Sequence, residues 1–178
     1  MKANKDTKEV GWEKLHTAKG SAKGVPALIR ALASAKDEAA AWQVVPQLLE
    51  ALCGEDAVPS SAVPAVQLLC QVETGAGASV AAYLVGEALA GGHLRRLRQP
   101  ALGVDSSLAK AFEPYRTQFS KALRSSRGSL CAAAAFALSF TPNPAIEDGR
   151  AMLDRLEAAD EAWVALSLAM SLLASGLA

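Results

Sequence analysis

The chain repeats one local pattern three times, Val-Pro followed by an aliphatic run. The copies are VPALIRAL at residues 25–32, VPQLLEAL at 45–52 and VPAVQLLC at 63–70. Proline fits the first turn of an α-helix, because its missing N–H is not needed there, and it disrupts a helix interior or a central strand. The aliphatic residues behind it recur at helical spacing. Each copy therefore predicts a helix start and a buried stripe; at Pro46, inside a longer apolar pattern, we expect a kink or a restart.

The composition extends this prediction to the whole chain. Of the 178 residues, 51% are apolar and only 5% are aromatic. Much of the apolar content is Ala and Leu, which are strong helix formers, while clusters of β-branched and aromatic residues of the strand type are scarce. We therefore expect an all-α fold.

The spacing of the copies predicts how these helices are arranged. The three runs begin 20 and 18 residues apart, which gives a two-helix period of 38. Self-similarity at such a period is typical of helical-pair repeats, in which no pair buries its apolar stripe alone. The sequence predicts an α-solenoid of HEAT-like helical pairs with eight or nine helices. We expect one domain over residues 1–178, with a frayed polar lead at 1–8.

Several local features refine this prediction. Residues 9–18 have the spacing of a short helix, and Pro114 marks a second candidate kink within a helical pattern. Residues 91–105, GGHLRRLRQPALGVD, have the composition of a long irregular connection.

The N-terminal part resembles the start of small bacterial HEAT-like repeat proteins. Those proteins open with Trp, Leu, a His-Ala-type pair and Gly, followed by a Val-Pro-x-Leu-Leu helix and, after a second helix, an Ala-Val-Pro helix. The matching residues are Trp12, Leu15, His16, Gly20, Val25, Pro26, Leu28, Val63 and Pro64. The resemblance covers residues 11–73, and more generically 128–176, whereas 91–127 departs from it. It implies protein binding without catalysis; some members lie beside toxin genes and are taken to be immunity proteins, or antitoxins.

The sequence favours a cytoplasmic protein without a membrane anchor. The N-terminus is lysine-rich and lacks the apolar core of a secretory signal. Residues 162–178 carry no charge, but they are borderline in length for a membrane span and rich in Ala, Ser and Gly, so we expect a buried inner helix there. The three cysteines, Cys53, Cys70 and Cys131, are widely spaced within apolar runs, which favours buried thiols over disulfides.

The sequence shows no recognisable motif for catalysis or cofactor binding. Glu13 and His16 have the spacing of half a dimetal ligand motif, but no second copy follows, and neither His16 nor His93 has an evident nucleophile partner. We expect no enzymatic activity, no metal site and no cofactor.

Charge is separated into blocks along a chain whose net charge is zero. Residues 37–92 hold seven acidic residues and neither Lys nor Arg. Solvated helix faces explain such a block, and so does a partner surface that complements a basic protein, such as a toxin that cuts nucleic acid. The candidate protein-binding residues are Asp37, Glu38, Glu50, Glu55, Asp56, Glu73 and Glu87.

The next block supports a different function. Residues 93–127 hold eight Lys/Arg residues and two acidic ones. A cationic groove for nucleic acid is the alternative prediction, although the aromatic residues nearby fall at the spacing of a helical core. Its candidate residues are Arg95, Arg96, Arg98, Lys110, Arg116, Lys121, Arg124 and Arg127.

Overall fold

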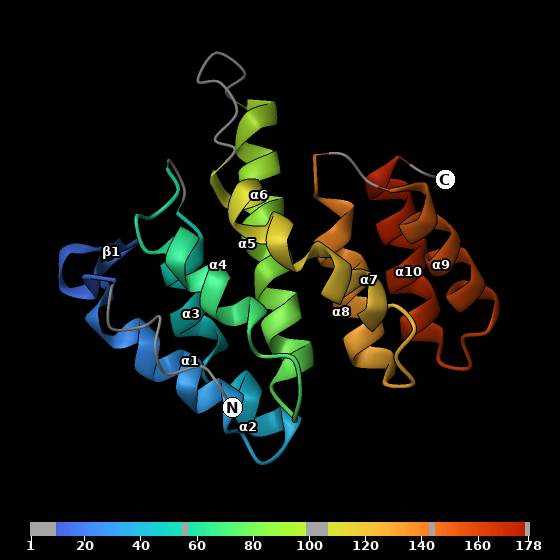
Figure 1. The fold of residues 1–178 in the computed structure, drawn as a ribbon, viewed down its shortest axis with the longest axis horizontal. Helices are drawn as coiled ribbons and strands as arrows, with labels where there is room; N and C mark the ends of the chain where they lie inside the picture. The colour runs from blue at the N-terminus through green and yellow to red at the C-terminus, as the bar shows by residue number, and fades with distance from the viewer. Residues whose placement is uncertain (1–9, 55–56, 99–106, 143–144, 177–178) are drawn as a thin grey trace.

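A computed structural model describes residues 10–54, 57–98, 107–142 and 145–176, and over 92–98 it describes the backbone alone. The predicted polar lead at 1–8 lies outside this range. The described chain is predominantly helical, which confirms the all-α prediction (Figure 1). The α-helices are α1 (Val25–Ala33), α2 (Glu38–Trp42), α3 (Val45–Leu52), α4 (Ala62–Cys70), α5 (Ala78–Arg98), α6 (Ser107–Phe112), α7 (Arg116–Ala122), α8 (Gly128–Ser139), α9 (Ile146–Glu157) and α10 (Ala162–Ser175).

The prolines act as helix starts, as the repeated pattern predicts. Pro26 and Pro46 lie in the first turns of α1 and α3, and Pro64 lies in the first turn of α4. At Pro46 the chain restarts, because α2 ends at Trp42 before α3 begins. Pro114 falls in a 3-10 turn, η5 (Glu113–Tyr115), between α6 and α7. Both candidate kinks are therefore breaks between helices.

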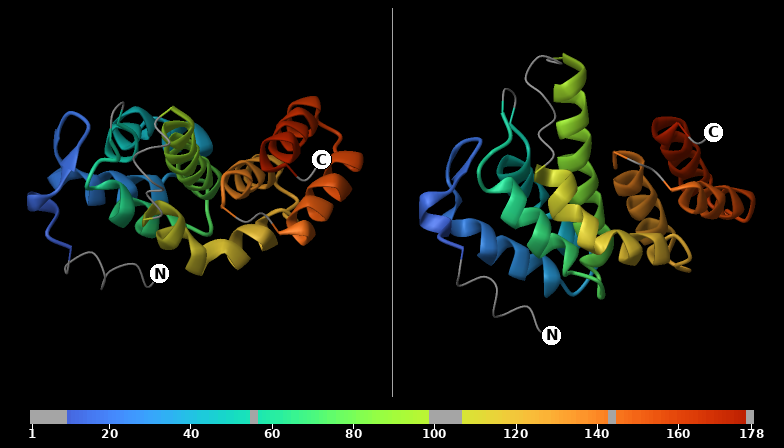
Figure 2. Two further views of the ribbon diagram at one scale, coloured as in Figure 1. Left: turned by 90° about the horizontal axis from the view of Figure 1, so that it is seen from above. Right: turned by 45° about the horizontal axis from the view of Figure 1, so that its top comes forward.

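The helices form two rows, which Figure 2 (left) shows most clearly. The outer row consists of α1, α4, α6 with α7, and α9. The inner row consists of α2 with α3, then α5, α8 and α10. Contacts join neighbours within the inner row, from α3 to α5, α5 to α8 and α8 to α10, and other contacts cross between rows, such as α4 to α5, α7 to α8 and α9 to α10. In that view the inner row bends, so that α5 and α10 lie on either side of α8.

The core lies between these rows and is built from small and aliphatic side chains. α8 contributes a run of buried alanines, 132–135, which lets α5 and α10 approach it closely. At the far end, a partly buried ion pair between Arg116 Nη2 and Asp148 Oδ2, 3.2 Å apart, joins the start of α7 to α9. The outer row is thus connected by charge as well as by apolar packing.

The predicted helix over 9–18 is wrong. The structure has a 3-10 turn, η2 (Trp12–Lys14), and a small hairpin of β1 (His16–Thr17) with β2 (Gly20–Ser21), which pairs His16 with Ser21 and Thr17 with Gly20; a second 3-10 turn, η3 (Ala22–Gly24), leads into α1. Tertiary hydrogen bonds hold this extended backbone, because the His16 N–H donates to Ser60 Oγ and the Ser61 hydroxyl donates to the His16 carbonyl. These contacts outweigh the local helical spacing.

The irregular connection predicted over residues 91–105 is wrong for its first part. α5 continues through Gly91 and Gly92 to Arg98, so the first part of the basic segment is helical, and residues 99–106 lie outside the described range. Two adjacent glycines disfavour a helix by about 1 kcal/mol each relative to alanine, but they do not forbid it when a long helix extends through them.

α10 is not the buried inner helix expected from its lack of charge. It buries Val164, Leu168 and Leu172 on one side and exposes large apolar side chains on the other. None of the helices within the described residues is both long and apolar enough to span a bilayer.

Candidate functional site

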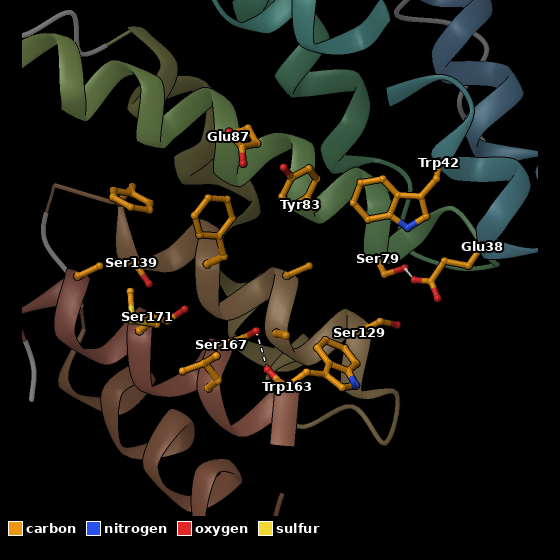
Figure 3. Close-up of a pocket in the computed structure, with 17 residues that line it drawn as sticks. Glu38, Trp42, Ser79, Tyr83, Glu87, Ser129, Ser139, Trp163, Ser167 and Ser171 are labelled. Atoms are coloured by element: carbon orange, nitrogen blue, oxygen red, sulfur yellow. Dashed lines mark hydrogen bonds between the residues drawn. The ribbon is translucent and has the colours of Figure 1, made fainter. Parts of the chain in front are cut away.

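A hollow of about 680 Å³ opens on the inner row, between α2, α5, α8 and α10 (Figure 3). We call it the inner groove. Its apolar lining comes from aromatic, aliphatic and alanine side chains, and its polar lining from two carboxylates and five serines. The lining residues are Glu38, Trp42, Ser79, Tyr83, Glu87, Ser129, Ala132, Ala133, Phe136, Ser139, Phe140, Trp163, Leu166, Ser167, Met170, Ser171 and Ala174.

An aromatic row forms one side of the inner groove. The ring centroids of Trp42 and Tyr83 are 5.1 Å apart, those of Tyr83 and Phe136 are 5.9 Å apart, and those of Phe136 and Phe140 are 5.4 Å apart. Such distances are those of favourable aromatic pairs, which hold each ring in place. Residues from α2, α5 and α8 thereby form one rigid apolar surface.

The exposed face of α10 forms the opposite side. Trp163, Leu166 and Met170 are three and four residues apart, so they share one helix face, and their exposed fractions are 48%, 65% and 60%. Trp42, across the groove, is 45% exposed. Leu173 extends the α10 face and is also exposed. Large apolar side chains clustered around one hollow in this way mark interaction sites in soluble proteins.

Among the described residues, the charges that line the inner groove are all negative. Glu38 and Glu87 are its charged lining residues, and neither Lys nor Arg lines it. Ser79 donates a hydrogen bond to Glu38 Oε1, which joins α5 to α2. Burial, followed by a hydrogen bond with Glu87, raises the pKa of Tyr83 to about 12, so its hydroxyl stays protonated at neutral pH.

The predicted acidic surface is distributed over several places. Glu38 and Glu87 both line the inner groove, at separate places (Figure 3), whereas the Asp37 carboxylate caps α2 by accepting from the Ala40 N–H at 2.7 Å. Glu50 Oε1 pairs with Lys19 Nζ at 2.7 Å. Glu73 lines a second hollow of about 560 Å³ between α4, α5, α7 and α8. Glu55 and Asp56 lie outside the described residues.

The predicted basic residues that the structure describes lie on the outer row or at its edge. Arg116 is engaged with Asp148, and Arg127 Nη1 donates to the Gly75 carbonyl at 2.8 Å. Lys110, Lys121 and Arg124 are exposed. The side chains of Arg95, Arg96 and Arg98 lie outside the described set, although their backbone belongs to α5.

The groups that could support chemistry lie elsewhere. Cys70 and Cys131 are buried, and burial raises the pKa of the Cys70 thiol above its ordinary value, which disfavours the reactive thiolate. His16 is exposed on the hairpin. Across the described part of the chain, no three His, Cys, Asp or Glu side chains gather in a way that suits a metal ion.

Pattern reading from the sequence found the two carboxylates of the inner groove but missed its apolar lining. Trp42 fits the apolar spacing of a core residue, and nothing in the spacing of Leu166 and Met170 separates them from the buried residues of α10. Their exposure follows from how the rows bend. Searches of protein-family models, curated proteins and solved structures found no match to this chain.

Proposed function

We propose that this protein is a non-catalytic protein-binding module, built as a HEAT-like solenoid, and that the inner groove holds its partner. Four pairs of neighbouring elements support this architecture: α1 with α2–α3, α4 with α5, α6–α7 with α8, and α9 with α10. In helical-pair repeats of this kind, the curved inner surface is the usual binding surface.

The observation that carries the proposal is the exposed apolar lining of the inner groove. Leaving Trp42, Trp163, Leu166 and Met170 in water is unfavourable, and burying their apolar surface yields roughly 25 cal/mol per Å². The apolar face also continues beyond the hollow to Leu173, so it is longer than the pocket that a small molecule would fill. A protein segment covers such a surface better than a small ligand does.

In its most specific form, the proposed function is that of an immunity protein, or antitoxin, that occludes a basic toxin. Toxins that cut nucleic acid need a cationic surface, and the described lining of the groove, whose charged residues are Glu38 and Glu87, would attract such a surface. Inhibition would then require occupation of the toxin surface and no chemical step.

The test uses the full chain and the separately purified products of the genes that neighbour its own. Binding is measured by titration calorimetry for the wild type and for the double variant Leu166→Ser/Met170→Ser. Both side chains are exposed, so the substitutions leave the core intact. We expect the double variant to weaken a specific complex by at least about tenfold, the scale on which truncation of apolar anchors acts in interfaces.

The matched control is Ile146→Ser/Leu153→Ser, which removes two exposed apolar side chains from α9, outside the groove. It should bind like the wild type. A groove variant that binds its partner as tightly as the wild type would rule out the inner groove as the binding surface. If none of the neighbouring gene products binds, the immunity role is wrong.

The nucleic-acid alternative would use Lys110, Lys121 and Arg124 on the outer row. It predicts a mobility shift of a short duplex at low salt that disappears as salt rises. The absence of a shift at low salt would exclude it.

A further inference from the structure

We propose that the segment held in the inner groove is an amphipathic helix that places one Lys or Arg side chain, flanked by apolar residues, against Glu87 and the Tyr83 ring. This inference rests on the proposed function and specifies the partner at the same site. Three properties of the described lining carry it: the position of the carboxylates, the hydrogen bonds that three of its hydroxyls already donate, and the small number of remaining donors.

The carboxylates lie where a cation would also contact aromatic rings. Ser79, Tyr83 and Glu87 are spaced four residues apart on α5 and form one stripe. Glu38 accepts a hydrogen bond from Ser79, and the Trp42 ring packs at a tilt against the Tyr83 ring. Figure 3 shows Tyr83 between Trp42 and Glu87 on one side of the groove. A Lys or Arg side chain above Tyr83 gains both a charge-assisted hydrogen bond and a cation–π contact.

Three of the hydroxyl groups that line the groove already donate hydrogen bonds within the protein. Ser139 Oγ donates to the Ala135 carbonyl at 2.7 Å, and Ser167 Oγ donates to the Trp163 carbonyl at 2.8 Å. Ser79 Oγ donates to Glu38 Oε1. What these groups still offer to a ligand is lone pairs, so the complementary ligand is a hydrogen-bond donor, as an ammonium or guanidinium group is.

The small number of donors in the described lining favours a helix over an extended segment. A strand laid in the groove would bring a row of carbonyl groups that need donors, and the described lining offers few: the Trp42 indole N–H and the hydroxyls of Ser129 and Ser171. A helix satisfies its own backbone groups and presents side chains at intervals of three and four residues to an apolar groove.

The experiment measures the binding of synthetic peptides to the full-length protein. Three stapled helical peptides are compared, each with the 14-residue length of α10 and the same apolar face of leucines. They differ only in the residue at the centre of this face, which is Arg, norleucine or Glu. Stapling is needed because a free helix of this length is only marginally stable in water. Binding is measured by fluorescence anisotropy over a series of salt concentrations.

We expect the Arg peptide to bind roughly tenfold tighter than the norleucine peptide, and the Glu peptide to bind most weakly. The advantage of the Arg peptide over the norleucine peptide should shrink as the salt concentration rises. Glu87→Gln and Glu38→Gln should each reduce the preference for Arg by roughly threefold or more, and the double variant should abolish it. Glu73→Gln, an acid outside the inner groove, is the control and should change nothing.

The outcomes separate this inference from the proposed function. If the Arg and norleucine peptides bind equally while Leu166→Ser/Met170→Ser weakens both, the cationic partner is wrong and the apolar docking groove stands. If none of the peptides binds, the inference is overturned, and the partner titration still decides the proposed function. The salt series on the wild-type protein tests the cationic contact without requiring any variant to fold correctly.

Discussion

At the scale of single residues, Tyr83 and Glu87 connect the geometry of the inner groove to a measurable property. The Tyr83 hydroxyl is partly buried, and its hydrogen bond to Glu87 needs the neutral phenol, so its pKa is raised to about 12. A group that holds its proton more tightly when folded stabilises the fold while the pH stays below its unfolded pKa, near 10. The free energy of unfolding should therefore fall as the pH rises from about 10 to about 12.

We predict that Glu87→Gln lowers the Tyr83 pKa but leaves it above that of an unperturbed tyrosine, because burial is the larger cause of the shift. The measurement is the tyrosinate absorbance during alkaline titration, in a Tyr115→Phe background so that Tyr83 reports alone. An unchanged Tyr83 pKa in Glu87→Gln would show that the two side chains do not interact.

At the scale of elements, the close approach of α5 to α8 depends on Gly86. A Cβ at this position would overlap the edge of the Phe136 ring and lie 3.2 Å from the Ala137 nitrogen. Alanine is the better helix former by about 1 kcal/mol, but forcing a methyl group into a packed contact costs typically 1–3 kcal/mol. Packing outweighs propensity here, and the displaced ring belongs to the aromatic row of the inner groove.

We therefore predict that Gly86→Ala lowers the free energy of unfolding by about 1–2 kcal/mol in chemical denaturation. Gly24→Ala is the matched control, because Gly24 has helical backbone angles and open space around its Cβ position; it should leave stability unchanged or raise it by up to about 1 kcal/mol. A Gly86→Ala protein as stable as the wild type would show that α8 can shift at little cost.

Some elements of the fold could be predicted from the sequence, and others could not. The helix starts at Pro26 and Pro46 could be predicted, because proline acts through local geometry that no distant contact alters. The hairpin at His16 could not, because hydrogen bonds to Ser60 and Ser61, more than forty residues away, determine it. Glu38 and Glu87 of the inner groove were found through charge alone. The place of Trp42 in the groove was not predicted, because helical spacing does not show whether an apolar stripe packs against a neighbouring helix or faces a hollow.

At the scale of the whole molecule, two rows of helices joined mainly through neighbours imply uneven local stability. α5 and α8 contact helices on both sides within the inner row, whereas α1 and α10 lie at the ends of their rows. In arrays whose units contact only their neighbours, the end units open independently at a small cost in free energy.

We predict that the backbone amides of α5 and α8 exchange with deuterium most slowly and that those of α10 and α1 exchange faster. Helices at the ends of the rows should thus exchange faster than helices in the middle. Mass spectrometry of peptides from the full-length chain measures this directly. Addition of a peptide that fills the inner groove should slow exchange in α10 more than in α1, because α10 lines that groove and α1 does not. Uniform protection of all the described helices would instead indicate a single cooperative globule and would count against the proposed solenoid.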